Sequence, residues 1–99
     1  MLILAGSVRL APGTRPEAQA SLEAMVEATR AEPGCIGFAF SFDALDEHLL
    51  RVFEIFEDEA ALEAHRTSAH MAEWRAATVR LGIGDRDMSE YIVSGYRKI

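Results

Sequence analysis

The order of two kinds of apolar spacing is the feature that most constrains this 99-residue chain. In four segments every second side chain is apolar, which is the spacing of a strand with a buried face. These segments span residues 1–10, 35–42, 48–56 and 89–98. Between them, residues 14–31, 58–66 and 68–82 carry apolar side chains at helical spacing. The predicted order is β-α-β-β-α-β, the split arrangement of an α+β fold with an antiparallel sheet.

Local signals mark both ends of the first predicted helix. Thr14 can cap its first turn, Glu17 would complete a capping box, and Pro16 lies where its missing N–H costs no hydrogen bond. The segment Glu32-Pro33-Gly34 ends the helix. Its predicted buried side consists of Leu22, Met25, Val26 and Thr29.

The segment 35–42 has one bulky and one small face. The bulky side chains are Ile36, Phe38, Phe40 and Phe42, and the small ones are Gly37, Ala39 and Ser41. We expect the bulky face to fill the core, whereas the small face leaves room for close packing or for a cavity.

Two of the three histidines lie in the second helical region. Asp58 can cap a helix that runs to Arg66, and Ser68 can cap a new one. On one continuous helix, His65 and His70 would point about 140° apart, so they do not have the spacing of a metal-binding pair. A break at Ser68 would let both turn toward one cavity. The alternative is one surface histidine and one partly buried, hydrogen-bonded histidine.

A second apolar face on the predicted sheet indicates a partner. Ninety-nine residues form one domain, predicted to span residues 1–99, and both helices would cover the same sheet face. The other face is predicted to carry Ile3, Ala5, Ala39, Phe53, Ile55 and Ile92. Exposed apolar faces usually mark interfaces. We therefore expect a two-fold homodimer that packs through this face.

Charge and composition exclude several classes of function. Sixteen acidic against ten basic residues give a net charge of −6, which argues against a nucleic-acid partner. No apolar run reaches the roughly 18 residues of a membrane span, and the apolar start lacks the basic leader of a signal peptide. The single cysteine, Cys35, cannot form an internal disulfide, so a cytoplasmic location is expected. No spacing typical of a metal site or phosphate loop is present, and we expect no metal and no cofactor.

Four short motifs together resemble a known family. They are Glu32-Pro33-Gly34-Cys35, Glu54-Ile55-Phe56, Ala60-Ala61-Leu62 with His65, and Ser68-Ala69-His70. Their order and spacing are similar to those of the antibiotic biosynthesis monooxygenase family. The resemblance implies ferredoxin-like protomers that pair into a dimeric α+β barrel.

The resemblance also implies an activity. Enzymes of this family oxidise small phenols, quinols or anthrone-like substrates with molecular oxygen, without metal or flavin. Such chemistry needs a flat apolar pocket, a base and hydrogen-bond donors. The implied catalytic residues are His65, as base or donor, and His70 in support. The implied substrate-binding residues are Ser7, Arg9, Phe53 and Trp74.

Other interpretations stay open from the sequence. The chain can be an isomerase or decarboxylase acting on a small hydrophobic acid, or a module that binds a small molecule without catalysis. Trp74 can be a core residue, and Ser7 and Arg9 can pair with carboxylates at a dimer interface. Haem degradation is disfavoured. Haem-degrading members of the superfamily resemble one another through an asparagine, a tryptophan and a histidine, and at the corresponding positions this chain has Ser7, His65 and Arg75.

Overall fold

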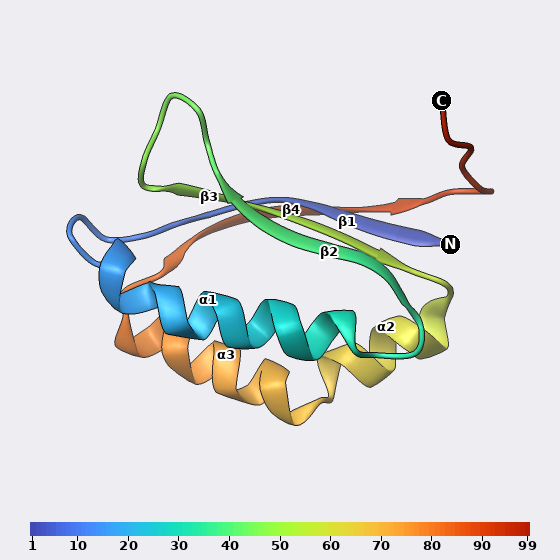
Figure 1. Ribbon diagram of the computed structural model, residues 1–99, viewed down its shortest axis with the longest axis horizontal. Coiled ribbons are helices and arrows are strands. Elements are labelled where there is room, and N and C mark those ends of the chain that lie inside the picture. The colour runs from blue at the N-terminus through green and yellow to red at the C-terminus, as the bar shows by residue number, and fades with distance from the viewer.

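The computed structural model describes all residues 1–99 as one antiparallel sheet with helices on a single face (Figure 1). The elements are β1 (Leu2–Arg9), α1 (Arg15–Arg30), β2 (Cys35–Phe42), β3 (Leu49–Phe56), α2 (Glu59–Arg66), α3 (Ala69–Arg80) and β4 (Gly84–Ile92). The strand order is β2-β3-β1-β4, with every neighbouring pair antiparallel. The predicted ferredoxin-like α+β fold is confirmed, with the second helix divided into α2 and α3.

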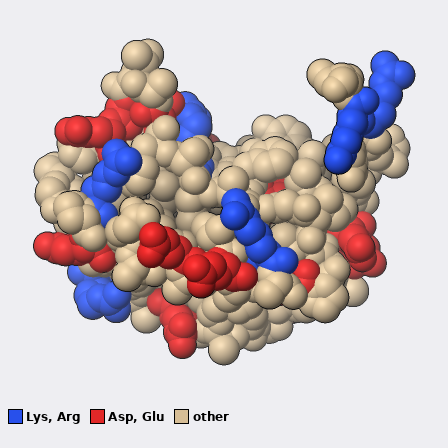
Figure 2. All heavy atoms as spheres, viewed as in Figure 1, with Lys and Arg blue, Asp and Glu red and all other residues tan.

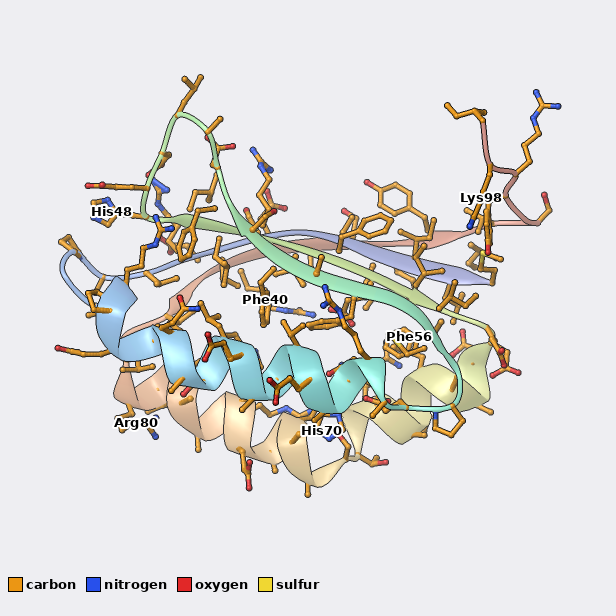
Figure 3. All side chains as sticks on the ribbon, viewed as in Figure 1. Phe40, His48, Phe56, His70, Arg80 and Lys98 are labelled. Carbon is orange, nitrogen blue, oxygen red and sulfur yellow. The ribbon has the colours of Figure 1, made fainter.

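The core lies between the sheet and the helices. Every second side chain of β3 points toward the helices and is buried, namely Leu50, Val52, Glu54 and Phe56. Leu22, Met25 and Thr29 of α1 are buried as predicted, and Val26 is partly buried. Phe40 and Phe56 point from the sheet toward the helices (Figure 3). One inward side chain in this apolar layer, Glu54, is a carboxylic acid, and it becomes important at the site below.

The last strand is shifted relative to the prediction. It spans Gly84–Ile92 rather than residues 89–98. Residues 84–88 have a polar sequence that is typical of a loop, but their backbone pairs with β1 at the sheet edge, where side-chain pattern matters little. The new register also corrects the position of Ile92. It lies opposite Leu2, on the helix-side face, whereas Tyr91 lies opposite Ile3 on the outer face.

Two smaller expectations are wrong. Thr14 occupies the N-cap position of α1, but its hydroxyl donates to the Ala11 carbonyl oxygen at 2.7 Å instead of capping the helix. Ile36 was expected in the core and is 39% exposed. A register shift between Cys35 and Gly37 turns its side chain out of the bulky row.

The outer sheet face carries no helix. Register places Ile3, Ala5 and Phe53 side by side there, and Phe53 is 44% exposed. Acidic and basic side chains are interspersed on the molecular face drawn in Figure 2. None of the helices is both long enough and apolar enough to span a membrane.

Candidate active site

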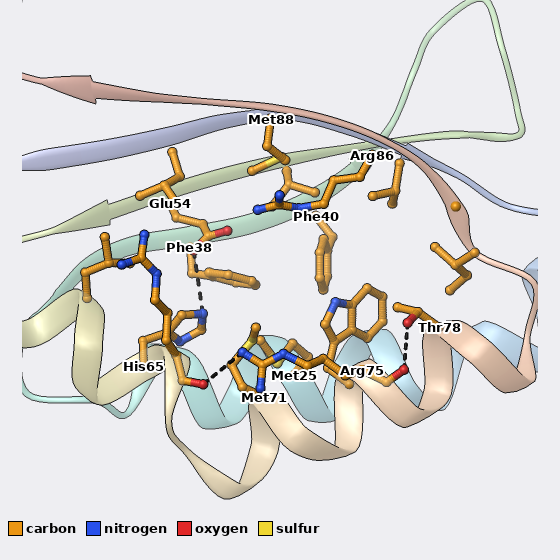
Figure 4. A pocket seen from close by; sticks show the side chains of 18 residues that line it. Met25, Phe38, Phe40, Glu54, His65, Met71, Arg75, Thr78, Arg86 and Met88 are labelled. Atoms are coloured by element: carbon orange, nitrogen blue, oxygen red, sulfur yellow. Dashed lines mark hydrogen bonds and ion pairs between the residues drawn. The ribbon is translucent and has the colours of Figure 1, made fainter.

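A cavity of about 370 Å³ lies between the inner sheet face and α3 (Figure 4). Most of its lining is apolar, contributed by all four strands and all three helices. These apolar side chains are Leu4, Val8, Met25, Phe38, Phe40, Val52, Leu62, Met71, Trp74, Ile83 and Met88. The polar side chains that line it are Glu54, His65, Arg66, Arg75, Thr78 and Arg86. A mostly apolar cavity with a few converging polar groups is typical of a small-molecule site.

An aromatic wall forms one side of the cavity. The ring of Trp74, from α3, lies 5.1 Å from that of Phe40 at an interplanar angle of 35°. Phe40 in turn meets Phe38 edge to face, with centroids 5.1 Å apart. Trp74 is the only tryptophan in the chain. Trp74, which the family resemblance implies as a substrate-binding residue, therefore does line the cavity, among flat apolar surfaces suited to an aromatic ligand.

Glu54 is the only acidic side chain that lines the cavity. In the sheet it lies between Leu4 of β1 and Phe38 of β2, and it is 8% exposed. Burial raises the pKa of Glu54 to about 7, and the nearby Arg86 guanidinium opposes part of that rise. The carboxyl therefore exchanges its proton near neutral pH, which is the range useful for acid–base catalysis.

His65 lies next to Glu54 in the lining of the cavity. It lies in the last turn of α2 and is 2% exposed. Its Nε2 is 3.6 Å from Glu54 Oε1, and its Nδ1 is 2.8 Å from Glu32 Oε2. Burial lowers the pKa of His65, and the hydrogen bond that its ring makes to the Glu32 carboxylate counteracts that shift in part. The geometry fits a neutral imidazole whose Nδ1–H donates to Glu32, which leaves Nε2 free to accept a proton.

The break between α2 and α3 brings the two histidines together. Ser68 caps α3 by accepting from the Met71 N–H, as predicted. His70, in the first turn of α3, then contacts Glu32 Oε2 with its Nε2 at 2.7 Å. His70 lies on α3 beneath the sheet (Figure 3). Only His65 lines the cavity, so His70 contacts the site through Glu32.

Three residues predicted to bind substrate lie elsewhere. Ser7, Arg9 and Phe53 are on the strand face that points away from the helices, and none lines the cavity. Arg9 forms an exposed ion pair with Asp46 at 2.7 Å. The structure thus brings together His65, His70 and Trp74, but it does not bring Ser7, Arg9 and Phe53 to them.

Sequence reasoning missed Glu32 and Glu54 as site residues. Glu54 did carry a signal, because it is the one acidic position on an otherwise apolar face of its strand. Glu32 was interpreted as part of a helix stop and of a family motif, and neither pattern indicates its contact with His65 and His70. Arg75 and Arg86 were also not foreseen as lining residues, and Arg86 falls in the part of β4 that precedes the predicted strand 89–98.

Glu32, His65 and His70 also form a set that could ligate a metal ion. Their nearest oxygen and nitrogen atoms all lie within 4.8 Å of one another. Two imidazoles and one carboxylate are ligands that a divalent transition metal accepts. The same atoms already satisfy one another, because a single carboxylate oxygen contacts both rings.

A family model described as "Antibiotic biosynthesis monooxygenase" matches residues 1–77. Among curated relatives, an uncharacterized Synechocystis protein is 29% identical over 73 residues, which cover 74% of this chain and 50% of the relative. The Mycobacterium tuberculosis protein named "Putative monooxygenase Rv0793" is 37% identical over 65 residues, which cover 66% of this chain and 63% of the relative. This chain therefore matches about half of one relative's length and less than two thirds of the other's.

Solved structures share the fold over nearly their whole length. A Deinococcus radiodurans protein superposes with a TM-score of 0.90 at 20% identity, covering 100% of this chain and 98% of its own. The Pseudomonas aeruginosa protein PA3566 gives a TM-score of 0.82 at 26% identity, and the match covers 95% of this chain and 94% of PA3566. The structure of Rv0793 gives a TM-score of 0.76 at 27% identity, and the match covers 99% of this chain and 98% of Rv0793.

Proposed function

This chain belongs to the antibiotic biosynthesis monooxygenase family, and from that premise we propose that it is a cofactor-independent monooxygenase of a small phenol, quinol or anthrone-like substrate. One observation carries the proposal. A buried histidine and a buried carboxyl face each other at 3.6 Å in an apolar, aromatic-walled cavity. Such a cavity supplies a base, a proton donor and flat apolar surfaces for the substrate's rings.

The proposed reaction needs no electrons from outside the substrate. For an anthrone, the ring methylene loses one proton to a base, and the resulting enolate gives electrons to molecular oxygen. A carbon–oxygen bond forms to give a hydroperoxide. The second methylene proton then leaves, the O–O bond breaks, and water departs as the carbonyl forms. One oxygen atom ends in the quinone and the other in water, so atoms and electrons balance.

In this proposal His65 is the base at its Nε2, and the other polar groups assist it. Glu32 orients the ring and stabilises the imidazolium once it forms, as a carboxylate does in a catalytic triad. Glu54, with its pKa raised to about 7, supplies the proton that departing water requires. His70 holds Glu32 in place, and its side chain is 20% exposed, so it links the cluster to solvent.

Oxygen uptake tests the proposal directly. We would measure uptake by chelator-treated protein with anthrones, naphthols and dihydroquinones. The variants are His65→Ala, Glu54→Gln and, as a matched control, His48→Ala. His48 lies at the end of the β2–β3 loop, away from the cavity (Figure 3). We expect about 100-fold slower uptake without His65, because general-base catalysis contributes on that order. His48→Ala should be unchanged.

Three results would contradict parts of the proposal. Full activity in His65→Ala would contradict the assignment of His65 as the base. Activity that is lost to chelator and restored by a divalent metal would favour a metal site at Glu32, His65 and His70. Product formed without oxygen would favour an isomerase or decarboxylase, which the same acid–base pair can support.

A binding module without catalysis is the second candidate. It is favoured by the hydrogen bonds that one ring nitrogen of His65 and one of His70 make to the same Glu32 oxygen, since such a cluster stabilises a fold without any chemistry. It predicts saturable binding of aromatic ligands, no uptake with any of them, and tolerance of substitution at His65.

The uncovered sheet face supports a homodimer. Ile3, Ala5, Ile55 and Phe53 are contiguous on that face by register, and Tyr91 extends the surface at its edge. A second copy packed face to face would bury this surface symmetrically, which closed two-fold pairing allows. We propose the homodimer on this basis, together with the dimeric barrel that the family resemblance implies.

A further inference from the structure

Three arginines border the cavity, although the protein is acidic overall. Arg66 ends α2, Arg75 lies on α3 and Arg86 lies on β4. The lining contains one carboxyl, Glu54, and that group is buried with a pKa near 7. In a chain of net charge −6, the cavity therefore has a local excess of positive charge. Charge of one sign in a cleft concentrates ligands of the opposite sign.

None of the three guanidinium groups has a carboxylate partner. Arg75 donates to the backbone carbonyl of Arg66 at 2.9 Å, and neither Arg66 nor Arg86 donates a side-chain hydrogen bond within the protein. Elsewhere, Arg9 and Arg51 each form an ion pair with an aspartate. In Figure 4, Arg86 extends from β4 along the sheet side toward Glu54, while Arg75 lies on the helix side. The cavity is thus bordered by unpaired cations on both sides.

We propose that the ligand of this cavity is an aromatic carboxylate, with its rings against the aromatic wall and its carboxylate held by Arg66, Arg75 and Arg86. Guanidinium groups bind carboxylates through paired N–H donors, and they stay charged at any relevant pH. The apolar lining accounts for the rings, and the arginines account for the charge. This inference deepens the proposed function, and it rests on that function only for the chemistry at His65.

Binding of an already oxidised ligand tests the charge separately from the reaction. The probe is 9,10-anthraquinone-2-carboxylate, and its neutral match is the 2-carboxamide. Quenching of Trp74 fluorescence reports binding, because this only tryptophan lines the cavity. We expect the carboxylate to bind about tenfold more tightly than the amide at low salt. The difference should shrink as salt is raised to about 0.3 M, because the arginines are solvent-exposed.

Arginine variants locate the effect. Arg75→Gln and Arg86→Gln should each weaken carboxylate binding roughly three- to tenfold and leave amide binding unchanged. Arg86→Lys should restore part of the loss. Arg80→Gln is the matched control, since Arg80 is an exposed arginine of the same helix as Arg75 and does not line the cavity.

Several outcomes would overturn the inference. Equal affinity for the acid and the amide would do so, as would failure of both to bind. An Arg80→Gln variant that loses as much affinity as Arg86→Gln would show a general charge effect instead. Charge discrimination without any oxygen uptake would support the inference and contradict the oxygenase, so the two failures are distinguishable.

Discussion

The Glu32 carboxylate lies 2.8 Å from Nδ1 of His65, across 33 positions of sequence. This contact ties the segment after α1 to the last turn of α2 and determines which nitrogen of His65 faces the cavity. A histidine whose Nδ1–H is held by a carboxylate presents Nε2 as the acceptor. The proposed base thus depends on a residue that does not line the cavity.

Replacing Glu32 should therefore change both stability and tautomer. In Glu32→Ala the buried Nδ1 of His65 loses its partner, which costs about 1–3 kcal/mol of unfolding free energy. Urea unfolding measures the loss, and nitrogen chemical shifts of the ring report the tautomer. Glu27→Ala, an exposed glutamate on α1, is the control and should change neither. Unchanged stability together with an Nε2–H tautomer in the wild type would refute this role for Glu32.

Glu54 should make stability depend on pH. Its pKa is about 7 in the folded protein against 4.5 for the ordinary group. The folded state therefore binds an extra proton between these values, and stability falls as pH rises through that window. The full difference between these two pKa values corresponds to about 3 kcal/mol of unfolding free energy. Glu54→Gln should thus be more stable than the wild type at pH near 8, and about equal to it at pH near 4.

The difference in unfolding free energy between Glu54→Gln and the wild type isolates the contribution of the Glu54 carboxyl. His65 is common to both, and its lowered pKa acts with the opposite sign, because stability is lost as pH falls below its ordinary value of 6.5. Glu47→Gln, on an exposed loop, serves as the control and should follow the wild type at every pH. A difference between Glu54→Gln and the wild type that stays flat from pH near 4 to 8 would be inconsistent with a buried, protonated Glu54.

Sequence pattern predicted the elements whose side chains are buried on one face. It identified β3, α1 and the caps at Asp58 and Ser68, because burial and capping leave local signals. It misplaced β4, whose pairing at the sheet edge is carried by the backbone. It also grouped Ser7, Arg9 and Phe53 with His65 as site residues, although the predicted sheet already placed Phe53 on the face away from the helices. The role of Glu32 could not be predicted from the sequence, because its contact with His65 exists only once the end of α1 lies near α2.

Gly6 should be needed for the position of β4. A Cβ on Gly6 would overlap the backbone carbonyl oxygen of Asp87, beside the pair formed with Met88. Gly6→Ala should therefore displace β4 and cost about 2 kcal/mol or more in urea unfolding. In Gly37→Ala, the added Cβ would lie 3.9 Å from Ile55 Cδ1, an ordinary contact, so this control should lose little stability. Equal losses in the two variants would show that the close approach is not the cause.

The outer sheet face should control assembly through Phe53. A glutamate there would place a charge in the proposed interface, and a buried unpaired charge costs several kcal/mol. We therefore expect sedimentation to show a dimer for the wild type and a monomer for Phe53→Glu. Leu45→Glu makes the same chemical change on the β2–β3 loop, where Leu45 is 97% exposed, and should stay dimeric. A monomeric wild type, or dissociation by Leu45→Glu as well, would mean that the apolar face is not the surface that joins two copies.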